Sequence, residues 1–136
     1  MRRTNLVCAG LLGLLLPAGT AIARPLYPLC GTEQLRSCVL NGNTFWYGGE
    51  FMRLVTINPP MPASPACADE ASTERAATDR LVDLLNGMEI FVFRYGTDAE
   101  GHTLTRVLVE GKEVGETLIS EHLAQPSSAA NGPWCS

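Results

Sequence analysis

A short polar turn is the first segment of this sequence whose residue types could do chemistry. Asn41-Gly42-Asn43-Thr44 separates two apolar runs, and an Asn-Gly pair in that setting predicts a β-hairpin turn. Acids in place of Asn41 and Asn43 would make a metal-binding turn, because the affinity of a hard cation follows the charge of its oxygen ligands. The two amides keep the chemistry of the turn and remove that charge.

Strand-like segments surround this turn, and helical segments follow them. Aromatic and β-branched runs that end at Gly or Pro clusters predict strands, whereas apolar residues at helical spacing predict helices. The order β-β-β-α-β-β-α predicts an α+β fold, mainly β, and suits a five-stranded OB-fold barrel with two helices. The expected strands are 38–40, 44–47, 51–57, 88–95 and 103–110, and the expected helices are 67–87 and 113–124.

The first residues are typical of a secretory signal peptide. Arg2 and Arg3 precede a short apolar run, and Ala21-Ile22-Ala23 fits an A-x-A cleavage site. A membrane anchor is the weaker interpretation, since the run is shorter than the roughly 20 residues that a span needs. We therefore expect a signal peptide over 1–23, an N-terminal arm over 24–37 and one domain over 38–136. The mature protein would be exported to a bacterial periplasm or the extracellular space, with no membrane contact after cleavage.

Cysteine usage agrees with export. Loss of Cys8 with the signal peptide leaves an even number of cysteines, which indicates two disulfides with three possible pairings. Metal binding is less favoured, because no C-x-x-C occurs and both histidines lie far from any cysteine in the sequence. We predict Cys30–Cys38, which closes a short loop, and Cys67–Cys135, which ties the C-terminal tail to the start of a helix.

Acidic charge limits the class of partner. The whole chain carries a net charge of −4, and cleavage after Ala23 removes two basic residues and no acids, which changes it to −6. An acidic protein has no long-range attraction to a polyanion. Nucleic acid is therefore possible as a partner but disfavoured.

Three segments, in order, resemble the staphylococcal nuclease-like (thermonuclease) family. In that family a D-G-D-T turn precedes the second strand, a third strand reads R-L-x-x-I-D-x-P-E, and a Y-G-R loop precedes the fifth strand. Here the segments read NGNT over 41–44, RLVTINPPM over 53–61, and EGH at the start of 100–124, which ends in a helix-like stretch. The resemblance covers about 38–124. It implies an OB barrel with its active site on one face, and Ca²⁺-dependent hydrolysis of DNA and RNA.

The resemblance also assigns metal positions. Asn43 and Asn58 fall where the family has metal-binding aspartates, and Asn41 falls on a further acid of the same turn. Pro59 stands where a backbone carbonyl contributes to the metal. Because three acids are replaced by amides, the resemblance implies a pocket that repels a divalent cation more than it holds one. We therefore expect no cofactor, although the family uses Ca²⁺.

Of the catalytic positions, only Arg53 is retained. It matches one phosphate-binding arginine, whereas His102 stands where the second arginine is expected. Met61 replaces the glutamate that would act as the base, and a thioether cannot take a proton. His102 lacks the planar fork that grips phosphate. We expect an exported, catalytically inactive binding module, a pseudoenzyme, whose partner is an unknown protein or a small anionic ligand. The alternative is a weak or unconventional nuclease.

Simpler roles are open for some of these residues. Arg53 would then pair with Glu50 or with the helix, and His102 would be an exposed loop imidazole. The aromatic run over 45–47 would offer a stacking platform for bases of the kind that OB folds use. Alternation along a strand requires some of these rings to face the core.

Overall fold

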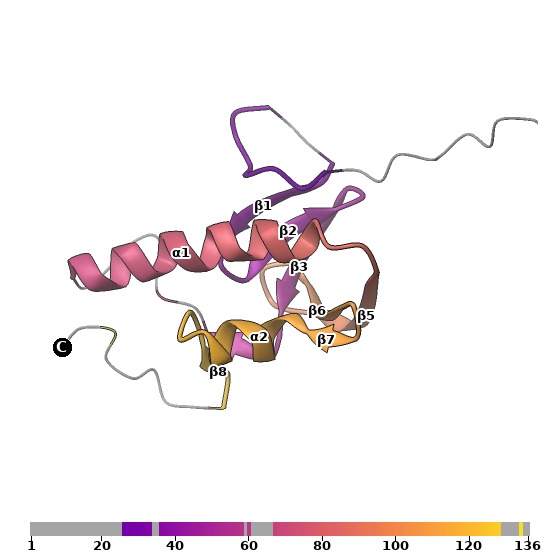
Figure 1. The fold of residues 1–136 in the computed structure, drawn as a ribbon. Helices are drawn as coiled ribbons and strands as arrows, with labels where there is room; N and C mark the ends of the chain where they lie inside the picture. The colour runs from indigo at the N-terminus through magenta and orange to yellow at the C-terminus, as the bar shows by residue number, and fades with distance from the viewer. Residues whose placement is uncertain (1–25, 34–35, 59, 61–66, 129–133, 135–136) are drawn as a thin grey trace, which may run out of the picture.

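The computed structural model describes residues 26–33, 36–58, 60, 67–128 and 134. These residues form an α+β fold built mainly of strands, with two helices and a mixed sheet (Figure 1). The predicted signal peptide lies outside the described residues. Neither helix in the described part of the chain has the length and apolar character that crossing a membrane requires.

The main elements follow the predicted order. The longer strands are β1 Cys38–Asn41, β2 Thr44–Tyr47, β3 Glu50–Leu54, β5 Ile90–Thr97 and β6 Thr103–Val109, and the helices are α1 Ala68–Leu85 and α2 Val114–Ser120. Three strands of two residues are added: β4 Ile57–Asn58, β7 Lys112–Glu113 and β8 Gln125–Pro126.

Most predicted bounds are shifted by no more than two residues, but two elements differ more clearly. The strand predicted over 51–57 is divided, because the chain bends at Val55 and Thr56 and β4 then pairs with β8 instead of continuing in the main sheet. The helix predicted over 113–124 ends at Ser120, since His122 takes a left-handed conformation with φ 60° that a helix cannot continue through.

The main sheet is mixed and has the order β1-β2-β3-β6-β5, with β7 paired to β6. All of its pairings are antiparallel except β3 with β6, which run parallel, with Met52 opposite Thr103. This parallel pairing brings the loop that precedes β6 beside β3. Among the described residues, β1 and β5 do not pair, so the predicted closure into a barrel is not seen.

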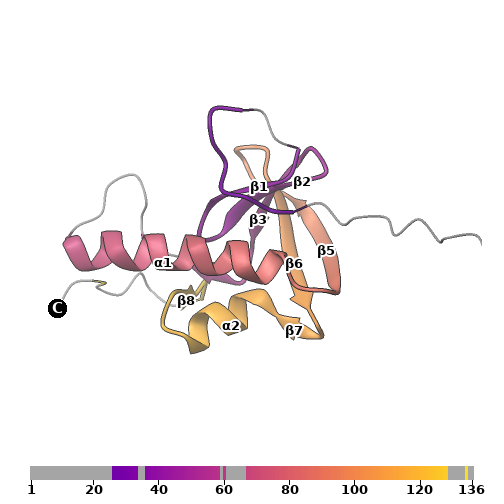
Figure 2. The same cartoon turned by 45° about the horizontal axis from the view of Figure 1, so that its top comes forward.

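The core lies between the inner face of the sheet and the two helices. Val39, Phe45 and Met52 stand in register across β1, β2 and β3 and are fully buried. The helices α1 and α2 lie beside each other (Figures 1 and 2), and each contributes buried leucines. These are Leu81 and Leu85 of α1 and Leu118 of α2. Gly115 of α2 packs so closely on the segment after β3 that a Cβ there would meet the side chains of Thr56 and Ile57.

The N-terminal arm belongs to the folded domain from Tyr27 onward. The Tyr27 side chain is only 3% exposed and stacks on Tyr47, with 6.0 Å between ring centroids. The Tyr27 backbone N–H donates to Asn86 Oδ1, and its carbonyl accepts from Asn86 Nδ2. Leu29 forms a parallel bridge with Val39, so the arm takes the outer side of β1. This occupation is one physical reason why β1 does not close the sheet onto β5.

The predicted Cys30–Cys38 disulfide is confirmed. Its Cα atoms lie 4.9 Å apart, and it fixes the arm to the first residue of β1. Cys67, the N-cap residue of α1, is also disulfide-bonded. Its predicted partner, Cys135, lies outside the described residues, so that pairing stays a prediction.

Candidate functional site

The turn at Asn41–Thr44 is held by its own amide side chains. Asn41 Oδ1 accepts a hydrogen bond from the Asn43 backbone N–H at 3.1 Å, and Asn43 Oδ1 accepts from the Thr44 hydroxyl at 2.9 Å. Asn43 is buried, and its carbonyl accepts from the Leu54 backbone N–H of β3. The predicted turn is therefore present, and both amide oxygens have local hydrogen-bonding roles in it.

The other predicted metal-binding and base positions come later in the chain than this turn. Asn58 lies at the end of β4, opposite Gln125 of β8. Pro59 and Met61 lie outside the described residues, so their roles stay predictions.

Arg53 stands on β3, one residue before Leu54, and points toward the loop between β5 and β6. Its Nη1 lies 3.2 Å from Asp98 Oδ2 and 3.1 Å from Glu100 Oε2. The pairing partner suggested by the sequence, Glu50, instead holds Arg94 at 2.9 Å. Arg53 is therefore an ion-paired arginine, but its partners are not the ones predicted.

His102 completes this group, which we call the Arg53 cluster: Arg53, Asp98, Glu100 and His102. The His102 Nδ1 lies 2.7 Å from Asp98 Oδ2, where its N–H donates to the carboxylate. The expectation of an exposed loop imidazole was wrong, since the His102 side chain is only 16% exposed. Its ring also contacts Phe51, with 4.5 Å between ring centroids.

Asp98 organises the loop and stays ionised. Its Oδ1 accepts from the backbone N–H groups of Glu100 and His102, and its Oδ2 accepts from Arg53 and His102. Burial raises the pKa of Asp98, but the hydrogen bonds from His102, Arg53 and Glu100 together outweigh it and lower the pKa to about 2. A fixed carboxylate therefore lies at the centre of the cluster at any physiological pH.

The net charge of the cluster differs from the sequence-based expectation. Arg53 alone would leave a cationic pocket, whereas the structure adds two carboxylates to it. With His102 neutral, the four side chains carry a net charge of −1. Asp98, Glu100 and His102 each offer one ligand atom, and these atoms lie within 4.8 Å of one another, so the donors suit a divalent cation. Arg53 already supplies positive charge to both carboxylates and competes with such an ion.

Aromatic rings extend from the cluster across the outer face of the sheet. Trp46 stacks on Phe51, its register partner, with 4.6 Å between centroids and an interplanar angle of 16°. The expectation that alternation turns some rings of Phe45, Trp46 and Tyr47 into the core is confirmed, because Phe45 is in the core and Tyr47 packs against it, and the three rings form no common platform. Phe51 takes their place beside Trp46.

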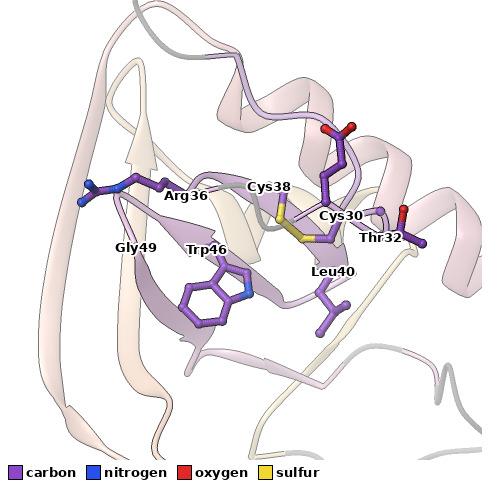
Figure 3. Close-up of a pocket in the computed structure, with 9 residues that line it drawn as sticks. Cys30, Thr32, Arg36, Cys38, Leu40, Trp46 and Gly49 are labelled. Carbon is purple, nitrogen blue, oxygen red and sulfur yellow. A yellow bond between two sulfur atoms is a disulfide. The ribbon is translucent and has the colours of Figure 1, made fainter.

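Trp46 also lines a hollow of about 480 Å³ beside the disulfide. Leu40 and the Cys30–Cys38 bond face the same space (Figure 3). The Arg36 guanidinium extends away from Leu40 toward Gly49, and its Nη2 donates to the Gly48 carbonyl at 2.8 Å. The hollow is thus mainly apolar, with an arginine at its rim.

Sequence reasoning did not place Asp98, Glu100 or Phe51 in the site. One signal for the acids was available, because Asp98, Glu100 and His102 alternate along the chain before a predicted strand. Their approach to Arg53 depends on the parallel pairing of β3 with β6, which no local pattern specifies.

No protein-family model matches this chain, and the search of curated proteins finds no match.

Proposed function

We propose that this protein is an exported, non-catalytic binding module with an OB-type fold related to staphylococcal nuclease. Two features support the relationship. The three family-like segments occur in order along the chain, and the five longer strands follow one another in the sheet as first, second, third, fifth and fourth, which suits a partly open Greek-key barrel.

The state of Arg53 carries the non-catalytic part of the proposal. In the Ca²⁺-dependent hydrolysis that the resemblance implies, an arginine is free to contact the phosphate and a carboxylate-bound cation stabilises the developing charge. Here Arg53 is neutralised by Asp98 and Glu100 at 3.1–3.2 Å. The amides of Asn41 and Asn43 hydrogen-bond within their own turn and carry no charge.

We propose that the partner is a protein or a small anionic ligand. The outer face offers stacked rings at Trp46 and Phe51 and an adjoining apolar hollow, which are surfaces for contact more than for reaction. A long nucleic acid is disfavoured, since the chain is acidic and the Arg53 cluster is not cationic.

Cleavage of single-stranded DNA and of RNA with Ca²⁺ present tests the absence of catalysis. We expect no turnover above the chelator control from the mature protein with its disulfides intact. Metal-dependent turnover that Arg53→Ala abolishes would show that this arginine does contact phosphate, and the non-catalytic proposal would fail.

One observation favours the alternative, a weak or unconventional nuclease. Asp98, Glu100 and His102 could hold a metal ion at positions other than those of the family. Arg53→Met removes the competing cation and keeps an apolar stem, so it should increase affinity for Mn²⁺ in calorimetric titrations. If the parent protein already binds Mn²⁺ and cleaves DNA, and Asp98→Asn abolishes both, the alternative is correct.

Export is the second part of the proposal. The Cys30–Cys38 disulfide is consistent with an oxidising compartment. N-terminal sequencing of the protein recovered from a bacterial periplasm or from the medium should begin at Arg24. A start at Met1 in that fraction would contradict the predicted cleavage.

A further inference from the structure

The two edge strands of the sheet, β1 and β5, differ in whether another segment covers them. At one end, the arm covers β1 through the bridge between Leu29 and Val39: the Cys30 N–H donates to the Val39 carbonyl, and the Val39 N–H donates to the Pro28 carbonyl. At the other end, β5 pairs only with β6 among the described residues, and Figure 2 shows it at the outer side of the sheet. An unpaired strand edge offers its backbone N–H and C=O groups to another extended chain.

β5 also carries a row of exposed aromatic side chains. Phe91 is 52% exposed, Phe93 48% and Tyr95 58%. Residues at alternate positions of a strand share one face, so these rings form a continuous stripe along the open edge. Exposed apolar groups gathered in this way mark an interaction surface more often than single exposed residues do.

The stripe borders a hollow of about 370 Å³ on the same face. Phe93 and Tyr95 line one part of it, and Arg106 and Leu108 of β6 line another. Arg106 stands opposite Phe93 in the sheet, and its buried Nε has no hydrogen-bond partner in the part of the chain that the structure describes. Such an unpaired donor costs free energy, and a turn of the Arg106 side chain toward a peptide carbonyl at the surface would satisfy it.

The surroundings of the stripe are acidic. Glu113 is buried, and both of its oxygens already accept hydrogen bonds, from Thr56 and from the Glu116 backbone. Glu113 and the exposed Glu116 line the hollow beside the stripe against one cation, Arg106, which favours a basic partner and disfavours a polyanion.

A second copy of this chain fits the stripe less well. Aromatic side chains bury about 150–250 Å² each, so three half-exposed rings offer roughly 300 Å² per molecule. Two such stripes give well under the roughly 1,200 Å² of a stable interface. Two copies would also bring like charges together, because each chain carries a net charge of −4. A short extended segment needs less area, since backbone hydrogen bonds supply part of its affinity.

We propose that β5 is the docking site for an extended, basic segment of a partner protein, which adds to the open edge as an extra strand. Alternate apolar side chains of that segment pack beside Phe91, Phe93 and Tyr95. Its basic side chains meet the carboxylates that line the hollow beside the stripe, and a backbone carbonyl of the segment accepts from the Arg106 guanidinium. This inference does not use the Arg53 cluster, so it holds whether or not the domain cleaves nucleic acid.

Fluorescence anisotropy with labelled model peptides tests the proposal on the mature, oxidised protein. The probes are a short peptide of alternating Val and Lys, its counterpart of alternating Val and Glu, and a Val-Lys peptide N-methylated at alternate residues. We expect saturable binding of the first alone, because N-methylation removes the donors that a strand edge requires. Equal binding of the Lys and Glu peptides, or of the methylated peptide, would overturn the proposal, as would no saturable binding of the Val-Lys peptide.

Matched variants locate the site. Phe93→Ser should weaken binding of the Val-Lys peptide by about tenfold, from the lost ring contact. Leu26→Ser alters an exposed apolar side chain, 79%, on the N-terminal arm and should leave binding unchanged. Tyr95→Ser is a second variant in case the first fails to fold, which circular dichroism detects. Equal loss in the Leu26 variant, or a dimer in sedimentation that Phe93→Ser dissociates, would refute docking of a basic segment at β5.

Discussion

Replacing Tyr27 with alanine tests whether the arm is part of the fold. The side chain is 3% exposed and lies in the core cluster, stacked on Tyr47, although it precedes the first strand of the sheet. Removal of a buried aromatic side chain costs about 3–5 kcal/mol, because the transfer free energy is lost and a cavity remains. We expect the lower part of that range for Tyr27→Ala, with a fall in melting temperature of more than ~10 °C.

Urea unfolding of the oxidised protein, followed by far-ultraviolet circular dichroism, gives the free energy of unfolding. Leu26→Ala is the matched control, since Leu26 is the neighbouring residue and is 79% exposed. Its effect should stay within about 0.5 kcal/mol. If Tyr27→Ala costs less than about 1 kcal/mol, the arm is not part of the cooperative unit and the packing argument is wrong.

Three further predictions concern charge, packing and the disulfide. The pKa of Asp98 is lowered from 3.8 to about 2 on folding, so its carboxylate stabilises the fold above about pH 4 and this stabilisation is lost as the pH falls toward 2. Asp98→Asn should flatten the free energy of unfolding over that window in acid titrations, and an unchanged slope would contradict the hydrogen bonds assigned to it. Gly115→Ala should destabilise by about 1–3 kcal/mol in thermal melts, because the added Cβ would overlap the Thr56 hydroxyl oxygen; Gly31→Ala, with nothing within 4 Å, is the neutral control. Replacing Cys30 and Cys38 together by alanine should cost about 2.5 kcal/mol in urea unfolding, and no loss would mean that the short loop is already ordered without its bond.

The sequence was most informative where structure is local. The hairpin turn at 41–44 and the strand Thr44–Tyr47 follow from turn chemistry and aromatic composition, and both are present. The Cys30–Cys38 bond was also predictable, since two cysteines close in sequence before a strand can meet without a long-range fold. In each case the interacting residues are close in the sequence, and the two cysteines are separated by 8 positions.

Long-range pairing explains the rest. Arg53 lies 45 residues from Asp98 and 47 from Glu100, and they meet only because β3 and β6 run parallel with Arg53 opposite Leu104. Parallel strands are not joined by a hairpin turn, so no local sequence signal predicts that they pair. For the same reason, the residues next to Tyr27 in the sequence did not predict that its ring would lie in the core.

The position of Arg53 has a consequence for a protein exposed to a changing environment. A carboxylate loop neutralised by Ca²⁺ loses its order when the ion is diluted or chelated, because the ion is free to leave. A guanidinium attached to β3 has no such freedom, and it contacts both carboxylates at 3.1–3.2 Å without an ion. The shape of the loop from Asp98 to His102 is therefore independent of the supply of divalent cations. A domain with a tethered counterion keeps the same loop in hard water, in soft water and in the presence of a competing chelator.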